Sequence, residues 1–151
     1  MFHVVLHRPE IAPNTGNLMR LCVNTGNLLH LIRPLGFDLD DARLRRAGLD
    51  YREYADVSVH ETFDGFLDGV QPERVFAFTQ HAQTLYTTIG YEDGDVLLLG
   101  RESDGLPADV LGHRAVTEQV RIPIAEGGRS LNLANAAAIA VYEAWRQHDF
   151  H

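Results

Sequence analysis

The sequence predicts an α/β domain with a mostly parallel sheet flanked by helices. Short apolar runs typical of strands alternate along the chain with segments whose apolar residues follow helical spacing. Two of these runs, 74–79 and 96–99, are apolar enough to be central strands that are buried on both faces. With 151 residues, 45% hydrophobic side chains and no internal repeat or linker, the chain is expected to form a single domain over 1–151.

The first elements follow from an apolar run and the turns around it. Residues 2–6 are predicted to form a strand that leads through a proline-rich turn into a helix. Asn14 or Thr15 is expected to cap this helix, because a short side-chain oxygen at that position accepts a free backbone N–H. Gly26 stands where the left-handed residue that ends a helix is wanted. The next strand is expected over 28–32.

The later elements repeat this alternation. Ser130 is expected to cap the last helix, which ends in aromatic and arginine residues. The remaining predicted elements are a helix over 38–46, a short strand over 57–59, a weak helix over 62–67, a last strand over 120–124 and the final helix over 130–147.

Charge and composition narrow the classes of function. The net charge of −8 argues against a generally basic, nucleic-acid-binding surface, but residues 1–52 carry seven arginines against five acids and are therefore +2. The first third is the expected polyanion face. No apolar run reaches the roughly 18 residues of a membrane span, and no leader precedes the first strand, so a soluble cytoplasmic protein is expected. Cys22, the only cysteine, is interpreted as a buried thiol.

Three polar segments fall after predicted strands, where ligands bind in parallel sheets. Segment 9–26 gathers asparagines and Arg20 at a helix start, segment 97–107 ends a buried strand in a glycine-flanked turn, and segment 121–147 places a glycine pair before an alanine-rich helix. Each also has a plain structural explanation, namely helix capping, an ordinary turn and a surface helix. Together they favour one ligand site.

Several common chemistries are missing from the sequence. It has neither a dinucleotide-binding G-x-G-x-x-G nor a P-loop. The histidines show no convincing metal-ligand spacing, so no metal is expected and each is interpreted as a core or solvated side chain. Cys22 has no evident activating partner, and no Ser-His-Asp order is present.

In this order and spacing, the three segments resemble the SPOUT superfamily of knotted methyltransferases, and within it the tRNA (cytidine/uridine-34) 2'-O-methyltransferases. The likeness extends over the whole chain, including RLRRAGLDY near residue 44 and the ending VYEAWRQ. It implies a C-terminal trefoil knot, a homodimer, S-adenosyl-L-methionine (SAM) as cofactor without a metal, and methylation of the ribose of nucleotide 34, cytidine or modified uridine, in the anticodon stem-loop of leucine tRNAs.

The resemblance also implies roles for individual residues. The cofactor would be held by Phe78, Thr79, Gly100, Glu102, Gly105, Ile122, Ile124, Ser130, Leu131 and Asn135. The catalytic set would be Arg20, Asn17, Glu102, Ser130 and Asn132, with Arg20 activating the 2'-hydroxyl. The expected RNA contacts are Arg8, Arg43, Arg46, Arg129 and Tyr142.

The second motif departs from the family pattern at two positions. Arg101 replaces a proline and Asp104 replaces a basic residue, which loosens the turn and reverses a charge near the expected RNA. Arg101 is a candidate for a compensating phosphate contact. The open alternatives are methylation of another tRNA or rRNA position, a non-catalytic SAM- or RNA-binding module, and a nicotinamide-dependent oxidoreductase, which the missing glycine fingerprint disfavours.

Overall fold

The computed structural model describes residues 1–39 and 57–151. Within them, seven strands form one sheet in the order β3-β2-β1-β6-β4-β7-β5, and all neighbouring strands are parallel. The strands are β1 (His3–His7), β2 (Leu28–Ile32), β3 (Val57–His60), β4 (Val75–Phe78), β5 (Thr84–Leu85), β6 (Val96–Leu99) and β7 (Glu118–Arg121). The prediction of a parallel α/β domain is confirmed.

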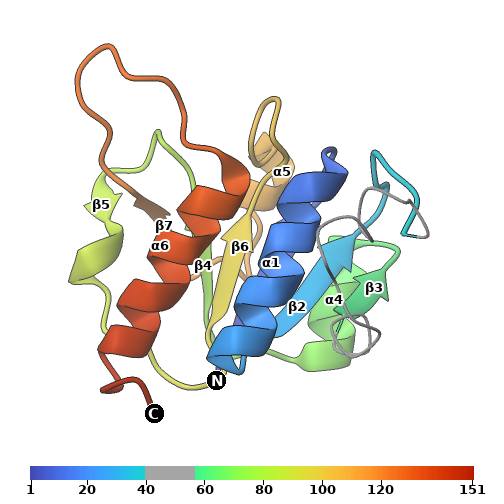
Figure 1. Cartoon of the computed structure of the whole chain (residues 1–151), viewed down its shortest axis with the longest axis horizontal. Coiled ribbons are helices and arrows are strands. Elements are labelled where there is room, and N and C mark those ends of the chain that lie inside the picture. Colours follow the sequence, from blue (N-terminus) through green and yellow to red (C-terminus); the bar gives the residue numbers. More distant parts are fainter. Residues whose placement is uncertain (40–56) are drawn as a thin grey trace.

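Helices cover both faces of the sheet (Figure 1). α1 (Ala12–Thr25) and α6 (Leu133–Arg146) pack side by side on one face, over a core that includes Phe2, Leu6 and Ala140. α4 (Phe63–Val70) and α5 (Ala108–Leu111) belong to a second core on the other face, and a 3₁₀ turn spans Tyr86–Thr88. β4 and β6 are buried throughout, as their uninterrupted apolar runs predict.

The parallel arrangement brings several connecting loops to one edge of the sheet. The loops that follow β1, β6 and β7 all leave the carboxyl ends of their strands and lie at the top of Figure 1. The two chain ends lie at the opposite edge. Because the loop after each parallel strand emerges at the same edge, segments more than 90 residues apart in the sequence meet there.

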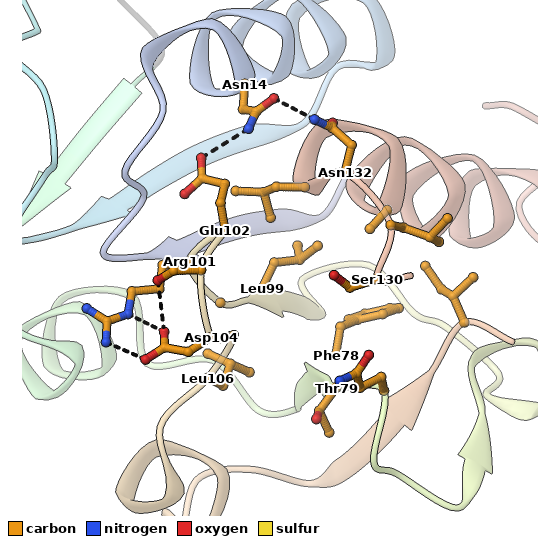
Figure 2. A pocket seen from close by; sticks show the side chains of 18 of the residues that line it. Asn14, Phe78, Thr79, Leu99, Arg101, Glu102, Asp104, Leu106, Ser130 and Asn132 are labelled. Atoms are coloured by element: carbon orange, nitrogen blue, oxygen red, sulfur yellow. Dashed lines mark hydrogen bonds and ion pairs between the residues drawn. The ribbon is translucent and has the colours of Figure 1, made fainter. Parts of the chain in front are cut away.

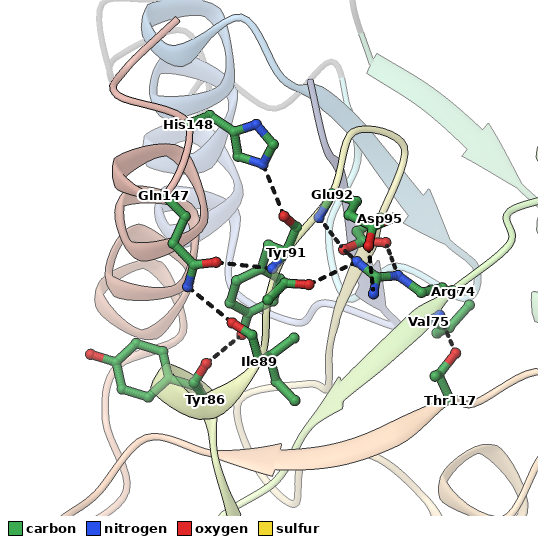
Figure 3. Close-up of polar contacts among 11 residues, drawn as sticks. Arg74, Val75, Tyr86, Ile89, Tyr91, Glu92, Asp95, Thr117, Gln147 and His148 are labelled. Atoms are coloured by element: carbon green, nitrogen blue, oxygen red, sulfur yellow. Dashed lines mark hydrogen bonds and ion pairs between the residues drawn. The ribbon is translucent and has the colours of Figure 1, made fainter.

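A network of hydrogen bonds and ion pairs lies at the opposite edge of the sheet, where β4 and β6 begin and α6 ends (Figure 3). Arg74 donates from Nε to Asp95 Oδ1 at 2.8 Å and from Nη2 to the carbonyl of Gly90 at 3.0 Å. Gln147, just after α6, accepts from the backbone N–H of Tyr91 at 2.9 Å and donates to the carbonyl of Ile89 at 3.0 Å. These contacts tie the end of α6 to the loop that enters β6.

Three imidazoles form a hydrogen-bonded row across neighbouring strands. His3 Nδ1 lies 3.0 Å from His30 Nε2, and His30 Nδ1 lies 3.0 Å from His60 Nε2, on β1, β2 and β3 in turn. The ring of Phe66 from α4 packs edge-on against the last two. Burial lowers the pKa of all three, and that of His30 to about 4. The sequence interpretation treated these histidines as separate.

Two predicted helix caps are wrong. α1 begins after Ile11 with no side-chain cap, because Asn14 is already inside the first turn and its amide contacts other loops. α6 is capped by Asn132 rather than Ser130, and the Asn132 Oδ1 accepts from the N–H groups of Ala134 and Asn135. Capping-type residues lie near both helix starts, inside the first turn of α1 and before the first residue of α6, and local preference alone does not decide where each helix begins.

Strand and helix boundaries differ from the predictions in a few further places. β7 spans Glu118–Arg121 instead of 120–124, because the chain turns into the loop with Pro123. The short elements β5, the 3₁₀ turn and α5 were not predicted, since each is under five residues and leaves no periodic signal. The helix predicted over 38–46 falls almost wholly outside the described residues.

Candidate active site

A cavity of about 520 Å³ opens at the carboxyl edge of the sheet. This volume is in the range of small-molecule and cofactor sites. Its apolar walls are Ile11, Phe78, Leu99, Leu106, Leu111, Ile122, Ile124, Leu131, Leu133 and Ala136. Polar groups from the first turn of α1 and from the loops after β4, β6 and β7 complete the lining (Figure 2). The site is therefore built by loops from distant parts of the sequence.

The turn after β6 depends on glycine at its base. A Cβ at Gly100 would lie 2.1 Å from the carbonyl carbon of Gly105 and 2.3 Å from the nitrogen of Leu106, which are backbone atoms without room to move. Gly105 has a φ of 71°, which disfavours other residues. The chain thus crosses itself closely here, and residues 101–104 project as a compact turn.

Glu102 joins this turn to the start of α1. Its carboxylate accepts from the backbone N–H groups of Glu10 at 2.7 Å and Ile11 at 3.0 Å. It also accepts from Asn14 Nδ2 at 3.2 Å. These donors include backbone groups at the start of a helix, where a negative charge is stabilised. Glu102 is consequently held by the loop that precedes α1.

Asn14 extends the connection to the third loop. Its Oδ1 accepts from Asn132 Nδ2 at 2.9 Å, while Asn132 caps α6 (Figure 2). Glu102, Asn14 and Asn132 form a continuous chain of hydrogen bonds, and all three line the cavity. Such a chain fixes the relative positions of the loops, because each amide uses its donor and acceptor together.

A second carboxylate, that of Glu10 before α1, contacts the turn after β6. Glu10 accepts from the backbone N–H and the hydroxyl of Ser103, each at 3.0 Å. Beside it, the Arg101 guanidinium makes a two-pronged ion pair with Asp104. The hydrogen bond from Arg101 lowers the pKa of the Asp104 carboxyl. The loops after β1 and β6 are thus joined twice, by the Glu102 carboxylate accepting from the first loop and by the Glu10 carboxylate accepting from the second.

Most of the predicted cofactor residues lie at the cavity. Nine of the ten line it: Phe78, Thr79, Gly100, Glu102, Gly105, Ile122, Ile124, Ser130 and Leu131. Asn135 lies in the first turn of α6, outside the lining. Of the predicted catalytic set, Glu102, Ser130 and Asn132 line the cavity, whereas Asn17 and Arg20 are exposed on α1 and lie outside it.

The predicted RNA contacts are dispersed. Arg8 is exposed directly after β1, at the same edge as the cavity, with a φ of 56°. Arg129 is exposed in the loop after β7. Tyr142 is 48% exposed on α6. Arg43 and Arg46 lie outside the described residues.

Sequence reasoning left Asn14 and Glu10 out of the site. Asn14 was grouped with Arg20 in the polar segment 9–26 but was interpreted as a helix cap and given no role of its own in the site. Glu10 gave no signal, since one acidic residue in a proline-rich turn is ordinary. Its role depends on Ser103, which lies 93 positions away in the sequence.

Fold and site together define an α/β domain that binds a small cofactor at the carboxyl edge of a parallel sheet. A family model described as the SpoU rRNA Methylase family matches residues 1–142. The chain belongs to this family, and it is a methyltransferase.

The relatives match along almost the entire chain. A tRNA (cytidine(34)-2'-O)-methyltransferase of Methylovorus glucosotrophus is 49% identical over 150 residues, covering 99% of this chain and 97% of the relative. A protein of the same description from Escherichia coli K12 is also 49% identical, covering 97% and 94%.

Solved structures agree with the fold. One, described as giving structural insights into 2-OH methylation of C/U34 on tRNA, superposes with a TM-score of 0.91 at 43% identity, covering 100% of this chain and 98% of that one. An AdoMet-bound rRNA methyltransferase from Sinorhizobium meliloti has a TM-score of 0.83 at 27% identity, with 96% of this chain and 56% of that one covered.

SAM is the cofactor of this family, and the cavity suits it. The volume and the apolar walls provide for an adenine ring, while the exposed Ser130 and the half-buried Glu102 lie in the lining for the charged part of the molecule. Among the described residues, no group of three metal-ligating side chains gathers. None of the described helices is long and apolar enough to cross a membrane.

Proposed function

We propose that this protein transfers a methyl group from SAM to the ribose 2'-hydroxyl of nucleotide 34, cytidine or modified uridine, in tRNA. The observation that carries the proposal is the meeting of Glu102, Asn14 and Asn132, from three distant segments of the chain, beside a cofactor-sized cavity. The 49% identity to two enzymes described as acting on cytidine 34 supports this position. Leucine tRNAs are the proposed substrates.

The chemistry sets what the side chains must do. A ribose 2'-hydroxyl is a weak nucleophile, and bound SAM supplies an activated methyl group. The protein must therefore orient the hydroxyl in line and help to remove its proton. In the proposed scheme Ser130, Asn132 and Glu102 hold the loops and the hydroxyl in position. Asn14 joins this set on geometry, and Asn17 remains a candidate on α1.

Arg20 is the proposed activating residue. Its guanidinium stays protonated, so it does not act as a base. It stabilises the negative charge that develops on the 2'-oxygen, or it polarises a neighbouring phosphate. Because Arg20 lies on α1 outside the lining of the cavity, we propose that it serves a site completed by a second copy of the chain.

This arrangement requires a homodimer. Support comes from large apolar side chains exposed on the helices beside the cavity, namely Val23 at 40% on α1 and Tyr142 at 48% on α6. Pairing through the α1 and α6 faces would bring the partner's Arg20 towards the cofactor. Sedimentation of the purified protein tests it, and a monomer at working concentration contradicts the proposal.

The remaining proposals concern the knot, the RNA contacts and the compartment. β7 lies between β4 and β5, which both precede it in sequence, and α6 then returns to pack on α1. This path supports a C-terminal trefoil knot.

The proposed contacts with the anticodon stem-loop are Arg8, Arg43, Arg46, Arg129 and Tyr142. The reaction is proposed to occur in the cytoplasm, where tRNA is found.

The decisive experiment locates the methyl group. Purified protein is incubated with methyl-labelled SAM and total tRNA, and the modified nucleotide is mapped by nuclease digestion and mass spectrometry. Label on the ribose of nucleotide 34 of leucine tRNAs is the expected result. Label on another tRNA, or on another nucleotide, contradicts the finer assignment.

Ribosomal RNA is the second substrate class to be tested in a parallel reaction. The family description names rRNA, and so does the Sinorhizobium structure at 27% identity. The tRNA assignment is preferred because the two relatives described as tRNA methyltransferases are 49% identical to this chain and match nearly its full length. Ribosomal RNA added in place of tRNA is expected to remain unlabelled.

A further inference from the structure

The turn that carries Glu102 is closed by an ion pair between the residues on either side of its tip. Arg101 donates from Nε and Nη2 to the two oxygens of Asp104, with Nη2 and Oδ2 2.5 Å apart (Figure 2). The backbone N–H of Gly105 donates to the carbonyl of Arg101 at 3.0 Å. The side chains and the backbone therefore close the same short turn.

The pair also lies in an acidic environment. Glu10 approaches the Arg101 Nη1 to 4.0 Å, and Glu10 itself accepts two hydrogen bonds from Ser103. The carboxylates of Glu10 and Asp104 thus both face one guanidinium. Without that cation they would repel each other, and the contact between the loops after β1 and β6 would weaken.

Glu102 and Ser103, at the tip of the turn between Arg101 and Asp104, make the contacts with the start of α1 and the loop before it. Glu102 accepts from Glu10 and Ile11 and contacts Asn14, and Ser103 donates to Glu10. Displacement of the turn would break these contacts together and deform one wall of the cavity. An exposed ion pair contributes little to the global stability of a folded protein. Its effect should instead be local and appear in cofactor binding.

We propose that Arg101 and Asp104 are a pair of positioning residues for the SAM site, in which their ion pair holds the turn that presents Glu102. The inference rests on the proposed function only in taking SAM as the ligand. It gives Arg101 a partner within its own turn and removes the need for a phosphate contact at this position.

The test is a double-mutant cycle measured by calorimetry with SAM alone. Arg101→Ala and Asp104→Ala are each expected to weaken SAM binding roughly fivefold, the equivalent of one well-formed exposed pair. The double variant should be no weaker than the weaker single variant, because the interaction is lost only once. The exchanged pair, Arg101→Asp with Asp104→Arg, should recover much of the affinity.

Two further readouts separate positioning from a general structural effect. The thermal midpoints of all variants should stay close to wild type, and added salt should weaken SAM binding more in the wild type than in the double variant. The KM for SAM should rise in both single variants, while the KM for tRNA stays unchanged. Arg114→Ala, an exposed arginine in the loop before β7 at the other edge of the sheet, is the matched control.

The outcomes are distinct. If Arg101→Ala weakens tRNA binding but not SAM binding, and Asp104→Ala changes neither, Arg101 is an RNA contact and the proposal is wrong. Unchanged SAM affinity in every variant also overturns it, while leaving the proposed function intact. Failure of the wild-type protein to bind SAM would overturn both.

Discussion

The amide of Asn132 donates to Asn14 Oδ1 at 2.9 Å, and so joins residues 118 positions apart in the sequence. Asn132 caps α6, and Asn14 contacts Glu102 in the turn after β6. One side-chain hydrogen bond therefore couples the start of the last helix to the start of the first. This relationship places Asn14 in the candidate active site.

Replacing Asn14 with alanine should lower the rate of methyl transfer roughly 100-fold, because small displacements of catalytic groups cost about that much. Asn132→Ala should have a similar effect, and the double variant should be less impaired than the product of the two predicts. Single-turnover assays measure this coupling. Asn24→Ala, exposed on the same helix, is the control. Independent effects of the two substitutions would contradict the coupling.

Arg20→Ala should abolish most methyl transfer, by roughly 100-fold or more, while SAM affinity stays unchanged. The reason is that Arg20 is proposed to act on the developing charge of the acceptor and lies outside the lining of the cavity. Single-turnover rates and calorimetry with SAM measure the two quantities separately. A near-wild-type rate would remove Arg20 from the mechanism.

Gly100→Ala should weaken SAM binding by roughly tenfold or more, because the added Cβ meets the backbone of Gly105 and Leu106 and the turn must open. Gly90→Ala provides the matched control, since a Cβ there meets nothing within 4 Å. Calorimetry with SAM makes the comparison, and equal affinities for both variants would argue against the close crossing.

The histidine row predicts a loss of stability on acidification. The pKa of His30 is lowered from 6.5 to about 4 in the folded protein, so the unfolded chain takes up the proton first. The stability that the protein has with a neutral His30 is fully present above pH 6.5, and it is lost as the pH falls from 6.5 towards about 4. Its full size is on the order of 3 kcal/mol.

Chemical unfolding at several pH values measures this loss. His30→Phe should flatten the fall in the free energy of unfolding between these two pH values, because the titrating group is gone. His151→Gln, an exposed histidine at the chain end, should leave the fall unchanged. An identical pH profile for His30→Phe and wild type would exclude the row as its cause.

Cys22 should be inert to thiol reagents in the folded protein. It is 2% exposed in the core beneath α1, and burial raises the pKa of its thiol to about 12, so almost no thiolate forms near neutral pH. Ellman's reagent is expected to label it only after denaturation. Rapid labelling of the native protein would show that α1 opens readily.

Local pattern was enough for the strands and for some helix ends. The run 28–32 is the strand β2 as predicted, and Gly26 ends α1 in the left-handed conformation with a φ of 67°. These features depend on neighbouring residues: hydrophobic periodicity sets the buried strands, and the missing Cβ permits the turn. The first residues of α1 and α6 were missed, because α1 begins after the apolar Ile11 and α6 is capped by Asn132 instead of Ser130, and local capping preference does not decide either start.

The sequence by itself determined an α/β domain with a parallel sheet and three polar segments at strand ends, together with a family resemblance that named the cofactor. Only the tertiary structure decided which polar side chains meet. Asn14 bridges two loops instead of capping a helix, Arg101 pairs with Asp104, and three separate histidines form one row. The physical reason is that strand order and a shared carboxyl edge bring these groups together, and such contacts leave no periodic trace along the chain.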